Sequence, residues 1–216
     1  YEVAPILQRC KIFHVPGNFK FAIEGTNDEA ALHTENAAIT AASDSLGSVS
    51  LTGYEIVKLV KASRACSEMA LSAFESYIVE VIAEAVARRI EKYIFTGTGT
   101  NQPGGVKTAG KGASGAYTDG TDQITVGKTA SLTEENVIAL YGLLGDGYER
   151  NAVWCMNKAT FFSDFFPLMN KSKNNVIEFA NGKYYIMGAE VYFTGSLAAH
   201  EAYLGDFSYI IGNYSQ

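Results

Sequence analysis

The chain has 216 residues, 47% hydrophobic and 19% charged, which is enough to bury one substantial core or two small ones. Its 23 acidic residues outnumber its 17 basic residues, and the net charge of −6 argues against a dedicated nucleic-acid binder. No apolar run reaches the roughly 18 residues of a membrane span, and the first residues do not form a signal peptide, so we expect no membrane partner. Cys10, Cys66 and Cys155 lack CxxC spacing, which favours reduced thiols in a cytoplasmic protein.

Residues 1–26 mix short apolar runs with proline and glycine, which predicts an extended N-terminal arm or short strands. From Phe21 to Val57 there is no Lys or Arg. The β-branched residues in 33–40 and 49–60 favour strands, and the stretch between them offers little apolar anchoring. We therefore predict a long two-stranded excursion, with an ordinary surface hairpin as the alternative. Its acidic residues are Glu24, Asp28, Glu29, Glu35, Asp44 and Glu55.

Residues 71–95 carry the helical pattern of the chain. Ser72 and Glu75 have the spacing of a capping box, and the apolar residues recur at helical spacing. Arg88, Arg89 and Lys92 suit the negative end of the helix dipole. The predicted inner face consists of Phe74, Ile78, Val81, Ile82, Ala85, Ile90 and Tyr93, with Glu75, Glu80, Glu84, Arg88 and Glu91 mostly outside it.

The second half of the chain mixes short strands and helices. We predict a strand at 123–126, a helix that begins at a second capping pattern of Ser131 and Glu134, and a buried strand at 152–157. An aromatic helix should follow from residue 158 and end near Pro167. Asn181-Gly182 indicates a turn before a hairpin or a bent strand at 183–195, and residues 201–215 indicate a further strand. The fold class is therefore α+β, without βαβ alternation.

The glycine-rich segment after the long helix raises the possibility of a phosphate site. Gly97 and Gly99 begin a G-x-G pattern, but the third glycine is missing and the segment follows a helix instead of opening one. Residues 105–112 match G-x-x-x-x-G-K, yet Gly112 stands where Ser or Thr must bind magnesium. We interpret the segment as the end of the helix followed by a change of chain direction, with Gly97 ending the helix in a left-handed conformation and Pro103-Gly104 forming a turn.

Other chemistry receives little support from the sequence. His14, His33 and His200 share no metal-ligand spacing, and no G-x-S-x-G motif is present. Trp154 and the phenylalanines at 161–166 could line a pocket, but such side chains are more often core. We predict no catalytic residues, no cofactor and no metal, and hence no enzyme.

The turn after the helix carries a resemblance to a known family. The segment "RRIEKYIFTGTGTNQPGGV" resembles the helix and GTGTxQPxGI-like turn of tailed-bacteriophage major capsid proteins, which have the Hong Kong 97-type fold. The segments at 152–161, 184–194 and 203–211 resemble the later strands of that family, with Glu190 standing where many relatives have proline. The resemblance assigns a structural turn to Gly97, Gly99, Gln102, Pro103, Gly104 and Gly105.

The resemblance also implies a division of the chain. Residues 1–26 would be an N-terminal arm, 27–57 an extended loop that reaches over a neighbouring subunit, and 58–129 a peripheral domain containing the spine helix 71–95. Residues 130–216 would form the axial domain, and the C-terminal segment that completes the peripheral domain is expected to be absent from this chain.

Two expectations concern contacts between subunits. Some relatives join subunits by an isopeptide bond from a loop lysine, and since residues 21–57 contain no lysine, we expect no such crosslink here. The acidic loop of one subunit should instead lie across basic residues of the next. The expected interface residues are Asp28, Glu29, Glu35, Asp44, Arg64, Arg88, Arg89 and Lys92.

The function that the resemblance implies is structural. The chain would self-assemble, through pentamers and hexamers, into an icosahedral virion capsid around phage or prophage DNA, after synthesis in the bacterial host cytoplasm. Portal and scaffolding proteins are expected partners, and contact with packaged DNA should be non-specific. An encapsulin-like compartment with an enzyme cargo stays open as the alternative, and a small-molecule enzyme is a more distant one.

Overall fold

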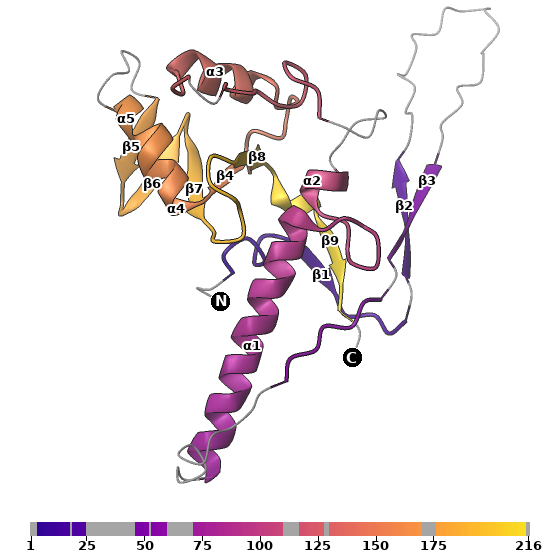
Figure 1. The fold of residues 1–216 in the computed structure, drawn as a ribbon. Helices are drawn as coiled ribbons and strands as arrows, with labels where there is room; N and C mark the ends of the chain where they lie inside the picture. Colours follow the sequence, from indigo (N-terminus) through magenta and orange to yellow (C-terminus); the bar gives the residue numbers. More distant parts are fainter. Residues whose placement is uncertain are drawn as a thin grey trace, which may run out of the picture. The chain divides into compact units, whose positions relative to one another are not determined.

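The computed structural model describes residues 4–17, 19–24, 46–51, 53–59, 71–109, 117–127, 130–169 and 176–214 (Figure 1). The chain divides into two compact units, one formed by residues 1–11 and 54–210 and the other by 12–53 and 211–216. Each unit is described by itself. The mixture of helices and short strands confirms the predicted α+β class.

The second unit contains one small antiparallel ladder and one small parallel sheet. β2 (Phe19–Glu24) pairs with β3 (Leu46–Leu51) in a register that places Phe19 opposite Leu51. β1 (Lys11–Phe13) pairs with β9 (Ile211–Asn213), and the side chain of Asn213 bonds to the backbone N–H and C=O of Val15. The predicted strand at 33–40 lies outside the described residues.

The first unit is built around a five-stranded sheet with the order β5-β6-β7-β4-β8. β4 and β7 are parallel, whereas the other neighbours are antiparallel. The predicted buried strand at 152–157 is confirmed as the fully buried β4. The strands of the sheet are β4 (Val153–Met156), β5 (Ile177–Ala180), β6 (Lys183–Ile186), β7 (Ala189–Phe193) and β8 (Ala202–Gly205).

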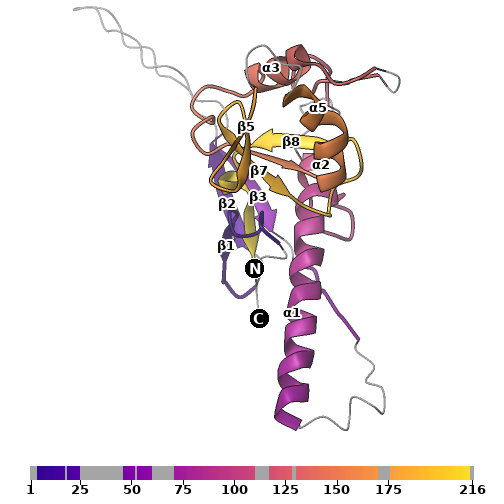
Figure 2. The same cartoon turned by 90° about the vertical axis from the view of Figure 1, so that its left-hand side faces the viewer.

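Helices cover both faces of this sheet, and β4 supplies side chains to both cores. Trp154 and Met156 point into a cluster with the phenylalanines of the aromatic helix, and the Trp154 indole N–H donates to the carbonyl of Ile186 at 3.1 Å. Val153 and Cys155 point the other way, into a cluster with Ile6. The aromatic residues of 154–166 are thus mainly core, as the sequence favoured. Figure 2 shows α5 packed against the sheet and α1 extending below the sheet.

The aromatic helix runs further than predicted. α4 (Lys158–Thr160) continues through a π-helical turn, η2 (Phe161–Phe165), into α5 (Phe166–Met169), so the predicted end near Pro167 is wrong. In the π turn the Phe166 N–H bonds to the Phe161 carbonyl, which resets the hydrogen-bond register just before the proline. Pro167 therefore occupies the first turn of α5, where a missing N–H costs little.

Two tight turns order the hairpins of the sheet. Asn181 and Gly182 connect β5 to β6 with φ values of 52° and 78°, which confirms the predicted turn. Met187 and Gly188 connect β6 to β7 with φ values of 52° and 80°. The second turn has the same left-handed geometry, but its first residue is a methionine. Because methionine is not a typical turn residue, the dipeptide did not stand out as a turn.

Other predicted boundaries need correction. α3 (Glu134–Gly142) is capped by Thr133 and not by Ser131, because Thr133 and Asn136 exchange the two hydrogen bonds of a capping box. Residues 123–126 contain an isolated bridge to Asp119 and no strand. The predicted closing strand at 201–215 is split into β8 and β9 by the 3-10 helix η3 (Phe207–Tyr209). Residues 54–59, expected in a strand, have no regular secondary structure.

The long helix α1 (Leu71–Thr96) matches the predicted 71–95 and includes Ser72, which therefore lies inside the helix and does not cap it. Its buried residues are Ala87, Glu91 and Phe95, whereas the predicted apolar face is only half-buried. The buried stripe differs from the predicted one because the contacts concentrate at the C-terminal end of the helix, where Phe95 enters the cluster around Ile6. α2 (Val106–Ala109) follows after a turn.

That turn is held by backbone contacts that leave no room for a side chain. The Gly97 N–H bonds to the Tyr93 carbonyl at 3.0 Å, and the Gly105 N–H bonds to the Gly97 carbonyl at 2.9 Å. A Cβ at Gly97 would lie 2.1 Å from the Pro103 carbonyl oxygen. The left-handed residues are Gly99, with φ 76°, and Asn101, with φ 54°, and not Gly97 as predicted. Glycine is required at 97 by close approach, not by its φ angle.

Replacing Gly97 or Gly105 with alanine should destabilise the protein by about 3 kcal/mol, because the added methyl group meets backbone atoms that cannot move independently. Gly104→Ala is the matched control, since a Cβ there has no neighbour within 4 Å and the substitution should cost at most about 0.5 kcal/mol. Denaturant unfolding of the three variants measures both quantities. Equal stability of all three would contradict the packing argument.

Candidate assembly surface on the long helix

The exposed side of α1 near its C-terminal end carries three basic residues on two successive turns. Arg88 is exposed and forms an i,i+4 ion pair with Glu84 at 3.3 Å. The Arg89 guanidinium lies 4.5 Å from the ring centroid of Tyr93, a cation–π contact that orients the arginine. Lys92 is exposed. The helix therefore presents a basic strip of Arg88, Arg89 and Lys92.

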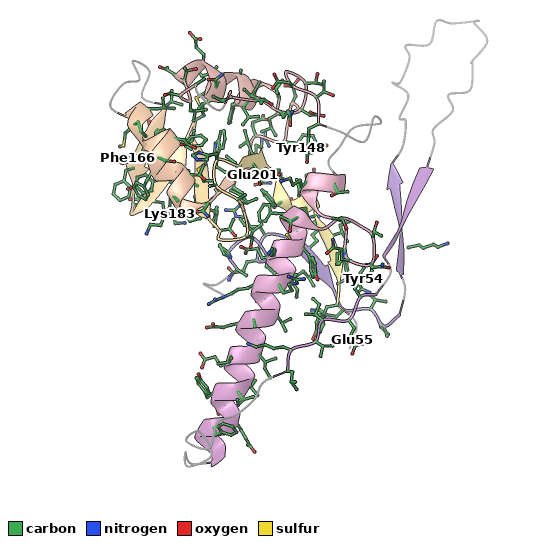
Figure 3. All side chains as sticks on the ribbon, in the orientation of Figure 1. Tyr54, Glu55, Tyr148, Phe166, Lys183 and Glu201 are labelled. Atoms are coloured by element: carbon green, nitrogen blue, oxygen red, sulfur yellow. The ribbon has the colours of Figure 1, made fainter. Side chains whose placement is uncertain are left out.

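A groove lies between this part of α1 and the extended segment 53–59. The groove has a volume of about 400 Å³ and is lined by side chains that include Arg89, Ala85 and Ile56. The Lys58 ammonium donates to the Val81 carbonyl at 3.0 Å and so ties the segment to the helix. Figure 3 shows Tyr54 and Glu55 at the start of this segment, beside α1. The groove places cationic side chains of both elements at one surface.

Five residues of the predicted interface, four acidic and one basic, belong to parts of the chain that the structure does not describe. Asp28, Glu29, Glu35, Asp44 and Arg64 lie outside the described residues. The structure thus brings together Arg88, Arg89 and Lys92, and it adds Lys58 from the neighbouring segment. The pairing of acidic loop and basic strip stays a prediction.

The buried side of α1 contains a carboxylate that joins three parts of the first unit. Glu91 is 2% exposed, and its Oε2 accepts the Ile6 N–H at 3.2 Å. Its Oε1 accepts the hydroxyl hydrogen of Thr194, just after β7, in a short hydrogen bond. Burial raises the pKa of Glu91 above its ordinary value, and the hydrogen bonds from Thr194, Ile6 and Leu7 offset part of that rise.

A second carboxylate holds the same N-terminal segment from the sheet. Glu190 on β7 lies 2.6 Å from the Lys183 ammonium and 3.7 Å from the Arg9 guanidinium. Arg9 also lies over the ring of Tyr192 and donates to its hydroxyl at 2.9 Å. Glu190 sits in a regular ladder opposite Tyr185 and Val153. The glutamate thus anchors the N-terminal segment by charge.

The two described thiols lie in this junction. Cys155 is fully buried, and burial raises its pKa well above the ordinary value. Burial, followed by the nearby Glu91 carboxylate, raises the pKa of Cys10 to about 11. Both are free cysteines, and both are overwhelmingly protonated at neutral pH. They serve as apolar packing and not as nucleophiles.

Sequence reasoning missed the buried junction. It placed Glu91 among the solvent-facing residues of the helix, and nothing in the spacing separated it from Glu84. The available signal was weak: Glu91 lies four residues from both Ala87 and Phe95, on one helical stripe with two apolar residues. Arg9 and Thr194 carried no signal, because their roles depend on contacts far apart in the sequence.

Two further observations concern other kinds of site. Within the described ranges, no group of three or more His, Cys, Asp and Glu side chains is arranged to hold a metal ion. Among the helices that the structure describes, none combines the length and the apolar composition needed to cross a membrane.

Known structures share this fold. The capsid of a native gene transfer agent (GTA) particle, computed with C5 symmetry, aligns with a TM-score of 0.66 and 20% identity over 96% of this chain and 74% of that chain. The capsid of an empty GTA particle, also computed with C5 symmetry, aligns with a TM-score of 0.68 and 22% identity over 95% of this chain and 74% of that chain. The fold is therefore that of a capsid protein.

The family follows from the sequence as a whole. The model of the phage capsid family matches residues 1–215, and the chain belongs to this family. No curated protein matches the chain. The resemblance drawn from the helix and its glycine-rich turn is confirmed.

The Glu91 junction predicts a specific dependence of stability on pH. Because the folded state raises the pKa of Glu91, stability is fully present below the ordinary value of 4.5 and is lost as pH rises through the raised value, where the buried carboxyl ionises. Glu91→Gln cannot ionise. The free energy of unfolding of the native protein should therefore fall relative to that of the variant as pH rises from 4.5 to 8.

Urea unfolding at pH steps across this range measures the difference. Glu80→Gln, an exposed carboxylate on the same helix, controls for the loss of one ionisable group. Parallel curves for the native protein and Glu91→Gln would contradict the assignment of a raised pKa to this residue.

Proposed function

We propose that this protein self-assembles into a closed icosahedral shell that encloses phage or prophage DNA. The observation that carries the proposal is the phage capsid family match over residues 1–215. The shared fold with two GTA capsids, both computed with C5 symmetry, supports an arrangement of copies around five-fold axes. The role is structural, with pentamers and hexamers of this chain as the building units.

The shell proposal assigns work to each part of the chain. Residues 71–96 act as the spine of a peripheral domain of the Hong Kong 97 type, and 130–216 act as the axial domain around the symmetry axes. Residues 27–57 extend from the β2–β3 ladder over a neighbouring copy. The buried junction at Glu91 supports this division, because it fixes the spine to the sheet of the proposed axial domain.

The charge of the chain suits a container for DNA. With a net charge of −6, the protein repels the phosphate backbone on average, so contact with packaged DNA is weak and non-specific. Portal and scaffolding proteins are further partners, and the assembled product is a virion capsid made in the cytoplasm of a bacterial host. The family match supports a phage-type shell over an enzyme-filled compartment.

Contact between neighbouring copies uses the basic strip. The acidic loop of one copy, with Asp28, Glu29, Glu35 and Asp44, lies across Arg88, Arg89 and Lys92 of the next, with Arg64 nearby. The exposure of the strip and the absence of lysine from 21–57 support this pairing. Each exposed ion pair contributes only about 0.2–1 kcal/mol to the free energy of association. The contact therefore stabilises the shell through its many repeats.

Electron microscopy of the purified full-length protein tests the shell. We expect closed hollow particles with five-fold vertices, and particles from infected or induced cells should contain DNA by ultraviolet absorbance and nuclease protection. A protein that stays monomeric under all assembly conditions contradicts the proposal. Closed particles that contain a co-purified enzyme and no DNA would support the compartment instead.

Charge reversal on α1 tests the docking of the acidic loop. Arg88→Glu with Arg89→Glu should raise the protein concentration needed for assembly by about tenfold at low salt and should flatten the dependence of assembly on salt. Glu75→Lys with Glu80→Lys is the control, since it changes the same helix by the same number of charges in the opposite direction. Light scattering against salt concentration measures both, and unchanged assembly of the arginine variant eliminates the pairing.

A further inference from the structure

Two groups of exposed or half-buried aromatic side chains lie at opposite edges of the five-stranded sheet. One group, the β5-edge patch, consists of Phe162, Phe166, Phe179 and Tyr184, from the aromatic helix and strands β5 and β6. The other, the β8-edge patch, consists of Tyr148 and Tyr209. Since β5 and β8 are the first and last strands of the sheet, the two patches lie far apart on the same unit. Figure 3 labels Phe166 and Tyr148 on opposite sides of the strands.

The β5-edge patch is a connected apolar surface. Phe179 on the edge strand is 56% exposed, and its ring centroid lies 4.8 Å from that of Tyr184. Phe162 is 42% exposed and lies 5.4 Å from Phe166 and 6.1 Å from Tyr184. Phe166 and Tyr184 are half-buried against the core around Phe161, whereas Phe162 and Phe179 are open to solvent. The edge of β5 adds backbone groups that no strand of the described sheet pairs.

The β8-edge patch is smaller and more polar. Tyr209 follows β8 in η3 and is 64% exposed, and Tyr148 meets it edge to face at 5.2 Å between ring centroids. The Lys11 ammonium lies 5.8 Å from the Tyr209 centroid. This patch therefore offers two ring faces, two hydroxyl groups and a cation.

Open aromatic surfaces of this kind are a feature of interfaces. Soluble monomers rarely expose contiguous apolar patches, and the cores of protein–protein interfaces are enriched in Phe and Tyr. The packing of each patch within its own unit explains why the rings are ordered. It does not explain why the rings remain exposed.

We propose that the β5-edge patch of one copy packs against the β8-edge patch of the next copy within a ring. This inference rests on the proposed shell function and assigns the surface through which neighbours in one ring touch. A cyclic ring uses heterologous contacts, in which one face of a subunit meets a different face of its neighbour. Two aromatic patches at opposite edges of one sheet satisfy this requirement.

Charge favours the same pairing. Exposed Glu178 lies on the edge strand β5, and in the β8-edge patch the Lys11 ammonium lies over the Tyr209 ring. Contact between the two edges brings this ammonium group to further aromatic ring faces. Contact between two β5 edges would instead place two Glu178 carboxylates together, which disfavours a symmetric dimer.

Paired substitutions in the full-length protein test the contact. Phe179→Glu and Tyr209→Lys should each raise the concentration needed for assembly by about tenfold, because each puts a charge into an apolar contact. The double variant places opposite charges across each interface and should recover assembly to within about threefold of the native protein. Thr121→Glu, at an exposed position in neither patch, is the control for added charge.

The outcomes separate this inference from the shell proposal. Native shells together with unchanged assembly of both single variants overturn the contact and leave the shell standing. Two impaired single variants without recovery in the double variant also overturn it, since the two edges then touch different partners. A native protein that never assembles overturns both proposals. Thermal unfolding confirms that each variant folds, and Phe179→Ser replaces Phe179→Glu if the charge impairs folding.

Discussion

The first unit depends on one buried carboxylate. Glu91 is the point where the N-terminal segment, the long helix and the sheet meet, and each of the three contributes a donor to it or carries it. A buried carboxyl without these donors would be strongly unfavourable, so the three parts must be in place together. The cluster around Ile6, Phe95 and Cys155 surrounds this junction with apolar contacts. Rigidity between helix and sheet follows from satisfying one polar group.

Local signals predicted much of the fold. The long helix, the buried strand β4 and the Asn181-Gly182 turn were all visible, because each depends on residues close together in the sequence. Where tertiary contacts decide, prediction failed. The π-helical turn absorbed Pro167, and the buried stripe of α1 moved to the part of the helix that meets the sheet. The π-helical turn has no signature in local spacing, and the four-residue spacing of Ala87, Glu91 and Phe95 is only a weak signal for the buried stripe.

The surfaces for assembly were only partly visible. Arg88, Arg89 and Lys92 could be proposed because a helix end with clustered cations stands out beside an acidic stretch. Glu91 could not be distinguished from exposed glutamates, since its partners are backbone N–H groups and a hydroxyl from distant segments. The glycines of the turn were read correctly as a corner, although the reason at Gly97 is backbone contact and not a left-handed angle.

The aromatic nature of the two sheet edges has a geometric consequence for a shell built from one polypeptide. In the proposed shell, a ring of five and a ring of six would require the same pair of edges to meet at slightly different tilts. Ring-to-ring contacts accept both offset and perpendicular arrangements at similar free energy, whereas a network of directional hydrogen bonds would favour a single tilt. Edges made of Phe179, Tyr184 and Tyr209 can therefore adapt to both tilts. One sequence can then form rings of five and of six without a second interface.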